Sequence, residues 1–253
     1  MALVGAPLLV TFVSGHLSDD GNTATEPSGA QSSAPSPSRP DLHASASLLG
    51  ITSCTALATA PTALEDRAEL AAGGDWSGLI SRHSGAALGQ LHVGITLQGG
   101  DRALTIDSID IEPRAGRASP PHDGALLCWA GQGDEPRVQL AADMDLPEPY
   151  LHDEESPTLP HFRDSVITLA PHEQVSLAVS FRAEEGHREF ELIIRYVLDG
   201  ERGSLPVPPP DGQEYAVTAP ADTYEAAYLS TVTGTRQMDS QEICQWTGAH
   251  ENC

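Results

Sequence analysis

The sequence predicts an all-β protein: an immunoglobulin-like antiparallel β-sandwich with one short N-terminal helix and a disordered N-terminal linker. Short segments alternate apolar and polar residues, turn signals separate them at regular spacing, and a Ser/Pro-rich stretch without hydrophobic period precedes them. Alternation with a period of two puts one strand face on a core and the other toward water, as in antiparallel sheets. We expect an apolar segment at 1–17, a linker at 18–47, the β-sandwich domain at 48–221 and a tail at 222–253.

The composition limits the classes of partner. The chain has 253 residues with 36 Asp and Glu against 13 Lys and Arg, a net charge of −23, and every basic residue is Arg. Such a field repels nucleic acid and anionic lipid, so we expect no nucleic-acid partner, although the same charge also serves plain solubility. Aromatic residues make up 5% of the chain, which argues against an aromatic-lined sugar cleft or a base-stacking platform.

The N-terminal segment indicates a location outside the cytoplasm. Its apolar run, MALVGAPLLVTFVSG, is shorter than the ~20 residues that span a bilayer and has no Lys or Arg before it. We interpret it as the outer half of a membrane helix or signal peptide; the alternative is a short apolar tail that packs on the domain. The segment 18–47 is rich in Ser, Ala, Thr and Pro and predicts a disordered stalk. The protein is therefore expected to be extracytoplasmic, secreted or membrane-anchored, with membrane contact through 1–17 only.

Two short elements precede the main strands. The run 48–59 is apolar and β-branched enough for a first strand. Within it, Ile51–Cys54 also matches a lipobox, but a strand that carries a disulfide cysteine is the better account. Thr62 and Glu65 have the spacing of a capping box and predict a helix over Ala63–Ala72, which Gly73 ends.

The segment Leu91–Glu112 reads as the clearest β-hairpin in the chain. Its first arm alternates strictly, and the following Gly-Gly-Asp sequence suits a tight reversal. The second arm begins in one phase and ends in the other, because Leu104 and Ile106 are followed by Ile109 and Ile111. An extra residue near Asp107 and Ser108, a β-bulge, would restore the face; a strand end at this point is the alternative.

The rest of the domain continues the same pattern. Tyr224–Thr231 is expected to be a helix turn or frayed coil, and Asp145–His161 an acidic, Pro-rich loop. Seven or eight short strands are expected after the hairpin, which favours a sandwich. The further expected strands are Ala125–Trp129, Val138–Met144, Val166–Leu169, Val175–Phe181, Phe190–Leu198, Leu205–Val207 and Tyr215–Thr218.

These motifs resemble a group of uncharacterised actinobacterial proteins, membrane-anchored or secreted, with a low-complexity linker and a C-terminal β-sandwich domain. Thr96–Gly99 matches a "tLQG" signature in that group, and Asp143–Asp145 partly matches a "DLD" element. The resemblance covers residues 48–218 and implies a fold and location but no established activity. The chain departs from the group in having no cysteine in Phe190–Leu198, so the group's disulfide pairing is not carried over.

Four cysteines, Cys54, Cys128, Cys244 and Cys253, allow three connectivities. The chain has no Cys-x-x-Cys motif, which argues against a zinc ribbon or a thioredoxin-type redox site. In an extracytoplasmic protein disulfides are the default. We expect Cys54 to pair with Cys128 across early strands, and Cys244 with Cys253 around a small loop.

The acidic loop is the one candidate metal site in the sequence. Its His and carboxylate side chains could bind Ca²⁺ or another divalent cation, the only cofactor considered, although their spacing fits no established metal motif. The alternative is a solvated loop at the end of the sandwich. The candidate ligands are Asp143, Asp145, His152, Asp153, Glu154 and His161.

No catalytic or cofactor-binding residues are assigned, because the sequence has no nucleophile elbow, no phosphate-cradling loop and no Lys. The function we expect is therefore non-enzymatic: a binding or sensory module on a flexible stalk, for a protein or cell-envelope component. The alternative is a structural envelope protein with divalent-cation-binding acidic loops. An atypical hydrolase that uses His and acidic loop residues is the third hypothesis.

Overall fold

The computed structural model describes residues 41–49, 54–114, 119–130, 139–210 and 213–248. The expected apolar segment 1–17 and most of the expected linker lie outside these ranges. Within the described part of the chain, every helix is too short or too polar to cross a membrane.

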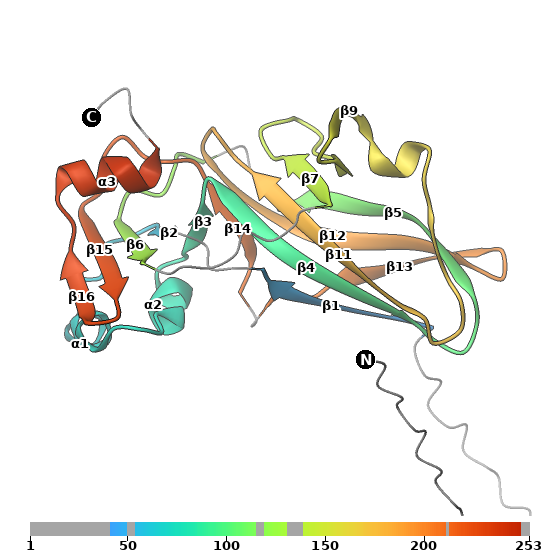
Figure 1. Ribbon diagram of the computed structural model, residues 1–253, viewed down its shortest axis with the longest axis horizontal. Helices are drawn as coiled ribbons and strands as arrows, with labels where there is room; N and C mark the ends of the chain where they lie inside the picture. Colours follow the sequence, from blue (N-terminus) through green and yellow to red (C-terminus); the bar gives the residue numbers. More distant parts are fainter. Residues whose placement is uncertain (1–40, 50–53, 115–118, 131–138, 211–212, 249–253) are drawn as a thin grey trace, which may run out of the picture. The chain divides into compact units, whose positions relative to one another are not determined.

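Two β-sheets form a sandwich-like arrangement (Figure 1). The first sheet has six strands in the order β1-β4-β11-β7-β8-β9, which are Leu42–Leu48, Gln90–Gly99, Gln174–Arg182, Leu140–Asp143, His152–Asp153 and Ser156–Pro160. The second sheet has ten strands, nine of them in the order β10-β5-β12-β14-β3-β2-β6-β15-β16, and β13 also pairs with β12. Its bounds in that order are Ile167–Leu169, Leu104–Pro113, His187–Leu198, Tyr215–Thr218, Ala86–Leu88, Cys54–Leu57, Ala125–Trp129, Ala226–Thr231 and Gly234–Gln237, with β13 at Glu201–Val207.

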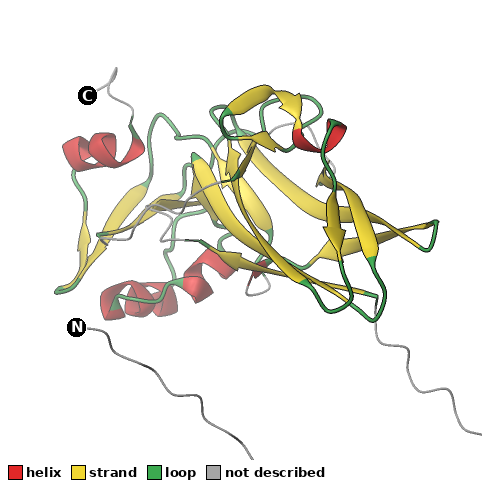
Figure 2. Ribbon diagram, turned by 45° about the vertical axis from the view of Figure 1, so that its right-hand side comes forward, coloured by secondary structure: helices red, strands yellow, loops and turns green. Residues whose placement is uncertain are grey.

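The described helices gather around the part of the second sheet that holds β2, β6, β15 and β16 (Figures 1 and 2). They are α1 (Leu64–Ala72), α2 (Ser77–Arg82) and α3 (Ser240–Thr247), and a 3-10 turn covers His161–Arg163. The main hydrophobic core lies between the two sheets. Two smaller clusters lie around β2 and β6, one packed against α3 and the other against α1 and α2. The expected helix Ala63–Ala72 corresponds to α1, but α2 and α3 were not expected.

The two arms of the expected hairpin are real strands, but they do not form a hairpin. Both edges of β4 are occupied by β1 and β11, and β5 pairs with β10 and β12, so the arms lie in different sheets. The chain from Gly100 to Ala103 is therefore an arch between the layers. The alternation is confirmed, since Leu91, Val93, Ile95 and Leu97 are all buried. Strand periodicity says which face is apolar, but it does not say which neighbour fills the edge.

The bulge in the second arm is confirmed. On β12, Arg195 faces Ser108 but the next residue, Tyr196, faces Ile106, so Asp107 is the extra residue of β5. Because of this insertion, apolar side chains on both sides of the bulge are buried in the same core.

Several boundaries differ from the sequence predictions. Strand β1 begins at Leu42, inside the expected linker, and pairs along its length with β4. The expected tail contains β15, β16 and α3, so Tyr224–Thr231 is mostly strand rather than helix turn or coil. The sheets are mixed rather than purely antiparallel, because β7, β3 and β6 each form one parallel pair. Helix α1 has Ala63 at its N-cap with no side-chain cap hydrogen bond, so the Thr62–Glu65 capping box is absent.

The expected Cys54–Cys128 disulfide is present and joins β2 to β6. Cys244 on α3 is also disulfide-bonded. Its expected partner, Cys253, lies outside the described residues.

Candidate functional site

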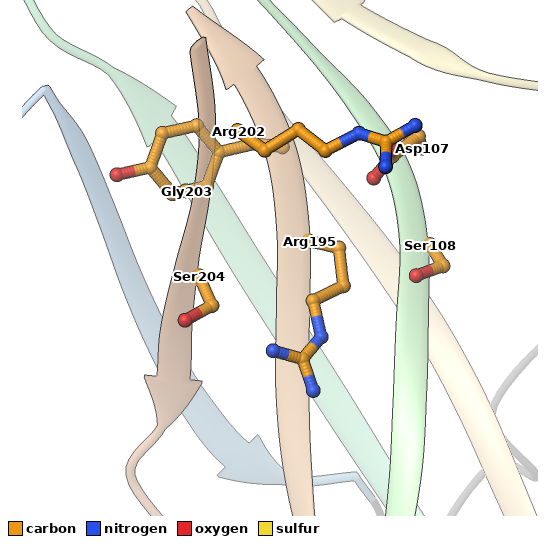
Figure 3. Close-up of a pocket in the computed structure, with 7 residues that line it drawn as sticks. Asp107, Ser108, Arg195, Arg202, Gly203 and Ser204 are labelled. Atoms are coloured by element: carbon orange, nitrogen blue, oxygen red, sulfur yellow. The ribbon is translucent and has the colours of Figure 1, made fainter.

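A groove of about 460 Å³ lies over the bulge on the face formed by β5, β12 and β13 (Figure 3). Arg195 on β12 faces Ser108 on β5 and Ser204 on β13, so the three form one row across the sheet. The bulge residue Asp107 and Arg202 of β13 extend the polar lining beside this row. Bulges re-aim side chains and are frequent next to binding sites. The groove is lined by Asp107, Ser108, Arg195, Tyr196, Arg202, Gly203 and Ser204.

Arg195 is held in place by two carboxylates of β5. Its Nε donates to Asp110 Oδ2 at 2.8 Å, and its Nη2 donates to Glu112 Oε1 at 2.7 Å. The hydrogen bond to Asp110 is the main reason why the pKa of Arg195 lies above its ordinary value. These side chains are about half exposed, so the pairs orient the guanidinium more than they stabilise the fold.

Arg202 and Asp107 are charged groups of the groove with unused hydrogen-bonding capacity. Arg202 has no ion pair among the described residues, and one carboxylate oxygen of Asp107 is buried without a hydrogen-bond partner among them. Figure 3 shows the Arg202 side chain crossing β12 toward Asp107, while Arg195 points away along the sheet. A buried carboxylate oxygen without a donor is costly, and such groups are rare in folded proteins outside functional or strained sites.

Gly203 sets the shape of the groove floor. It lies opposite Tyr196 in the ladder, and a Cβ on Gly203 would overlap the phenol ring of Tyr196. The ring therefore lies over the bare main chain of β13, where other residues would push it away. Glycine inside a strand commonly marks such a close approach.

The six acidic-loop residues do not converge as one ligand set. Among the described residues, no group of three or more His, Cys, Asp or Glu is arranged to hold a metal ion. A hollow of about 510 Å³ borders Asp143, Asp145 and His152, together with Arg182 and two Glu of the β11–β12 turn. Cation binding at this loop stays a prediction.

The carboxylates of this loop already have partners. Asp145 accepts from the main-chain N of Glu184 and Glu185 at 2.7 and 3.1 Å, and from Arg188 at 3.3 Å. Asp143 accepts from the main-chain N of Asp145 at 2.9 Å. Further along the chain, Asp153 Oδ1 lies 2.7 Å from His161 Nδ1, and Glu154 Oε1 accepts from Arg182 at 2.5 Å. The Nδ1 of His152 donates to the main-chain carbonyl of Asp153.

One polar network was missed by the sequence reasoning. Thr59 Oγ1 lies 2.8 Å from His83 Nδ1, and His83 Nε2 lies 3.0 Å from the buried carboxylate of Asp66. Arg82 donates to the same carboxylate at 2.9 Å. Burial raises the pKa of Asp66, but hydrogen bonds from Arg82 and His83 outweigh it and hold this pKa below its ordinary value. The residues are too far apart in the chain for a spacing motif to reveal the network.

The geometry of Thr59, His83 and Asp66 has the order hydroxyl, imidazole, carboxylate. In hydrolases such a chain activates the hydroxyl as a nucleophile. Here Arg82 shares the carboxylate with His83, which diminishes the negative charge available to the imidazole. The network also ties the turn after β2 to both α1 and the end of α2. We therefore assign it to the scaffold of the helical region.

Comparisons with known proteins add no family to this picture. No protein-family model and no curated protein matches the chain.

Proposed function

We propose that this chain is a non-enzymatic binding or sensory module, which takes a protein or cell-envelope component in the groove over the β5 bulge. The observation that carries the proposal is the juxtaposition of Arg202 and Asp107, because among the described residues Arg202 has no ion pair and one carboxylate oxygen of Asp107 has no hydrogen-bond partner. The groove thus places the guanidinium of Arg202 and the carboxylate of Asp107 along one wall. An immunoglobulin-like relationship of the sandwich is part of the proposal, and the two packed sheets support it.

The proposal places the module outside the cytoplasm, secreted or anchored through residues 1–17. The Cys54–Cys128 disulfide supports this location, because disulfides persist in oxidising compartments and are rare where thiols are kept reduced. The stalk and the anchor rest on composition alone, since residues 1–40 lie outside the described ranges.

The chemistry of the groove favours a ligand that both donates and accepts hydrogen bonds. Hydroxyl groups, amides and paired ammonium and carboxylate groups of envelope polymers or protein surfaces have this character. A polyanion is a poor ligand, because the net charge of −23 opposes it and Arg195 is already neutralised by two carboxylates. The Ser108 and Ser204 hydroxyls on either side of Arg195 add further donors and acceptors.

The test is an NMR titration of ¹⁵N-labelled protein with a soluble peptidoglycan-fragment mixture, which carries hydroxyl, amide and carboxylate groups. We expect amide shift changes centred on Ser108, Arg195 and Ser204. The Arg202→Ala variant should lose them, while the control Arg163→Ala should keep them. Arg163 is a suitable control because it lies outside the groove, in the turn after β9, and likewise has no ion pair among the described residues. Shift changes that are absent at millimolar concentration, or that survive in Arg202→Ala, would contradict the proposed site for this ligand class.

A further inference from the structure

Two histidines from distant parts of the chain stack on each other beside the junction of β2, β12 and β14. His122 lies in the loop before β6, and His187 is the first residue of β12. Their ring centroids are 3.9 Å apart, and the ring planes are inclined by 25°. At this separation two neutral imidazoles pack well, whereas two imidazolium ions repel each other strongly.

His187 is buried beside a carboxylate. The residue is 7% exposed, and its Nε2 lies 3.2 Å from Glu189 Oε1. Its Nδ1 is buried and has no hydrogen-bond partner among the described residues. In the neutral ring, Nε2 can donate to Glu189, and Nδ1 is then an acceptor without a hydrogen bond among the described residues.

The surroundings of His122 disfavour a charge on its ring. Burial lowers the pKa of His122, and the nearby ring of His187 lowers it further. The carbonyl of Ala56, 3.4 Å from Nδ1, and the carboxylates of Glu189 and Asp123 oppose this shift without cancelling it. Arg188 follows His187 in the chain, and its guanidinium donates to the carbonyls of Met144 and His187 and to the carboxylate of Asp145.

The pair fastens the segment 119–124 to the sandwich. The main-chain N of His122 donates to Thr218 Oγ1 on β14, and the main-chain N of His187 donates to the carbonyl of Ser119. At the other end of the segment, Gly124 donates to Leu57 of β2. The stacked rings lie between these attachments, so a charge on the His122 ring acts on the whole segment.

We propose that the stacked His122–His187 pair is an acid-sensitive latch: while both rings are neutral it holds segment 119–124 against β12 and β14, and proton uptake releases the segment. The first proton must enter a buried site, and a second would place two like charges 3.9 Å apart. The released segment leads directly into β6, which carries the disulfide to β2. Acidity would therefore loosen the packing of the β2–β6 region against β12 and β14. This inference is independent of the ligand groove.

The first test needs only the wild-type protein. Imidazole carbon resonances report the titration of each histidine, and amide hydrogen exchange reports the attachment of the segment. We expect His122 to titrate below the ordinary value of 6.5. We also expect the amides of His122, Gly124 and His187 to lose about tenfold in protection between about pH 7.5 and about pH 5, after correction for intrinsic exchange.

Two variants complete the test. His122→Phe keeps an aromatic ring in the stack but cannot take a proton, so its protection at Gly124 and His187 should stay constant over the same pH range. His172→Gln removes an exposed histidine that lies 3.7 Å from Asp101, and should behave as wild type. The latch is overturned if His122 titrates at or above 6.5, or if the pH-dependent loss of protection persists in His122→Phe. The wild-type measurement remains decisive should His122→Phe fold poorly.

Discussion

Cys54 on β2 and Cys128 on β6 face each other directly in an antiparallel ladder, and a disulfide joins them. The bond closes a loop with a sequence separation of 74 residues, which includes both arms of the β4–β5 arch and both helices α1 and α2. The disulfide thus links the strand that precedes the β4–β5 arch to a strand that follows it.

Removal of this disulfide is expected to lower the free energy of unfolding by about 4 kcal/mol, because a loop of this length restricts the unfolded chain strongly. The double variant Cys54→Ala and Cys128→Ala avoids a buried hydroxyl, since both cysteines are at most 2% exposed. Urea unfolding monitored by circular dichroism gives the difference. A loss below about 1 kcal/mol would show that the ladder around β2 and β6 is stable without the bond.

The sequence predicted the strands well where local alternation determines burial. The face of β4, the Asp107 bulge of β5 and the Cys54–Cys128 pair all follow from patterns within about twenty residues or from a count of four cysteines. The partners of β4 were not predictable in this way. Its edges are taken by β1, from the expected linker, and by β11, and no local pattern encodes such distant pairings.

The candidate site was likewise predictable only where it depends on local sequence. Asp107 and Ser108 were singled out as a bulge, but Arg202 and Ser204 reach the groove only because β13 pairs with the far end of β12. The acidic loop was singled out by its composition, yet its carboxylates bind Arg side chains and main-chain N–H groups that come from β11 and β12. Residue type showed which groups can carry charge, and tertiary pairing decided what they contact.

The loop before β6 contains a glycine that no other residue should replace. A Cβ on Gly124 would overlap the main chain of Thr59, which a rotamer change cannot relieve. We expect Gly124→Ala to lower the free energy of unfolding by about 1–3 kcal/mol through this overlap. Gly94→Ala is the matched control, because its new Cβ would meet the flexible end of Leu49 at 2.8 Å and should cost less. Equal losses in the two variants, measured by urea unfolding, would contradict the steric explanation.

The network around Asp66 is expected to make stability depend on acidity below about pH 4. The folded-state pKa of Asp66 lies below the ordinary value of 3.8, so its contribution is complete above 3.8 and is lost as pH falls through the folded-state pKa. Asp66→Asn should lower the urea midpoint at neutral pH and make the decline of that midpoint in acid less steep. Glu65→Gln, an exposed neighbour on α1, should change neither. An unchanged acid profile in Asp66→Asn would show that other carboxylates carry the acid sensitivity.

Asp145 could stabilise the fold or bind a metal ion, and the two roles predict different effects of substitution. Because its carboxylate accepts from two main-chain N–H groups and from Arg188, we expect Asp145→Asn to cost about 1–3 kcal/mol of unfolding free energy even with a chelator present. A dedicated calcium ligand would behave differently: the same substitution would leave the metal-free stability unchanged and abolish the heat of calcium binding in calorimetry. Glu148→Gln, at an exposed position of the same loop, controls for the loss of one charge. A stability loss in chelator for Asp145→Asn alone would assign this carboxylate to the β11–β12 turn.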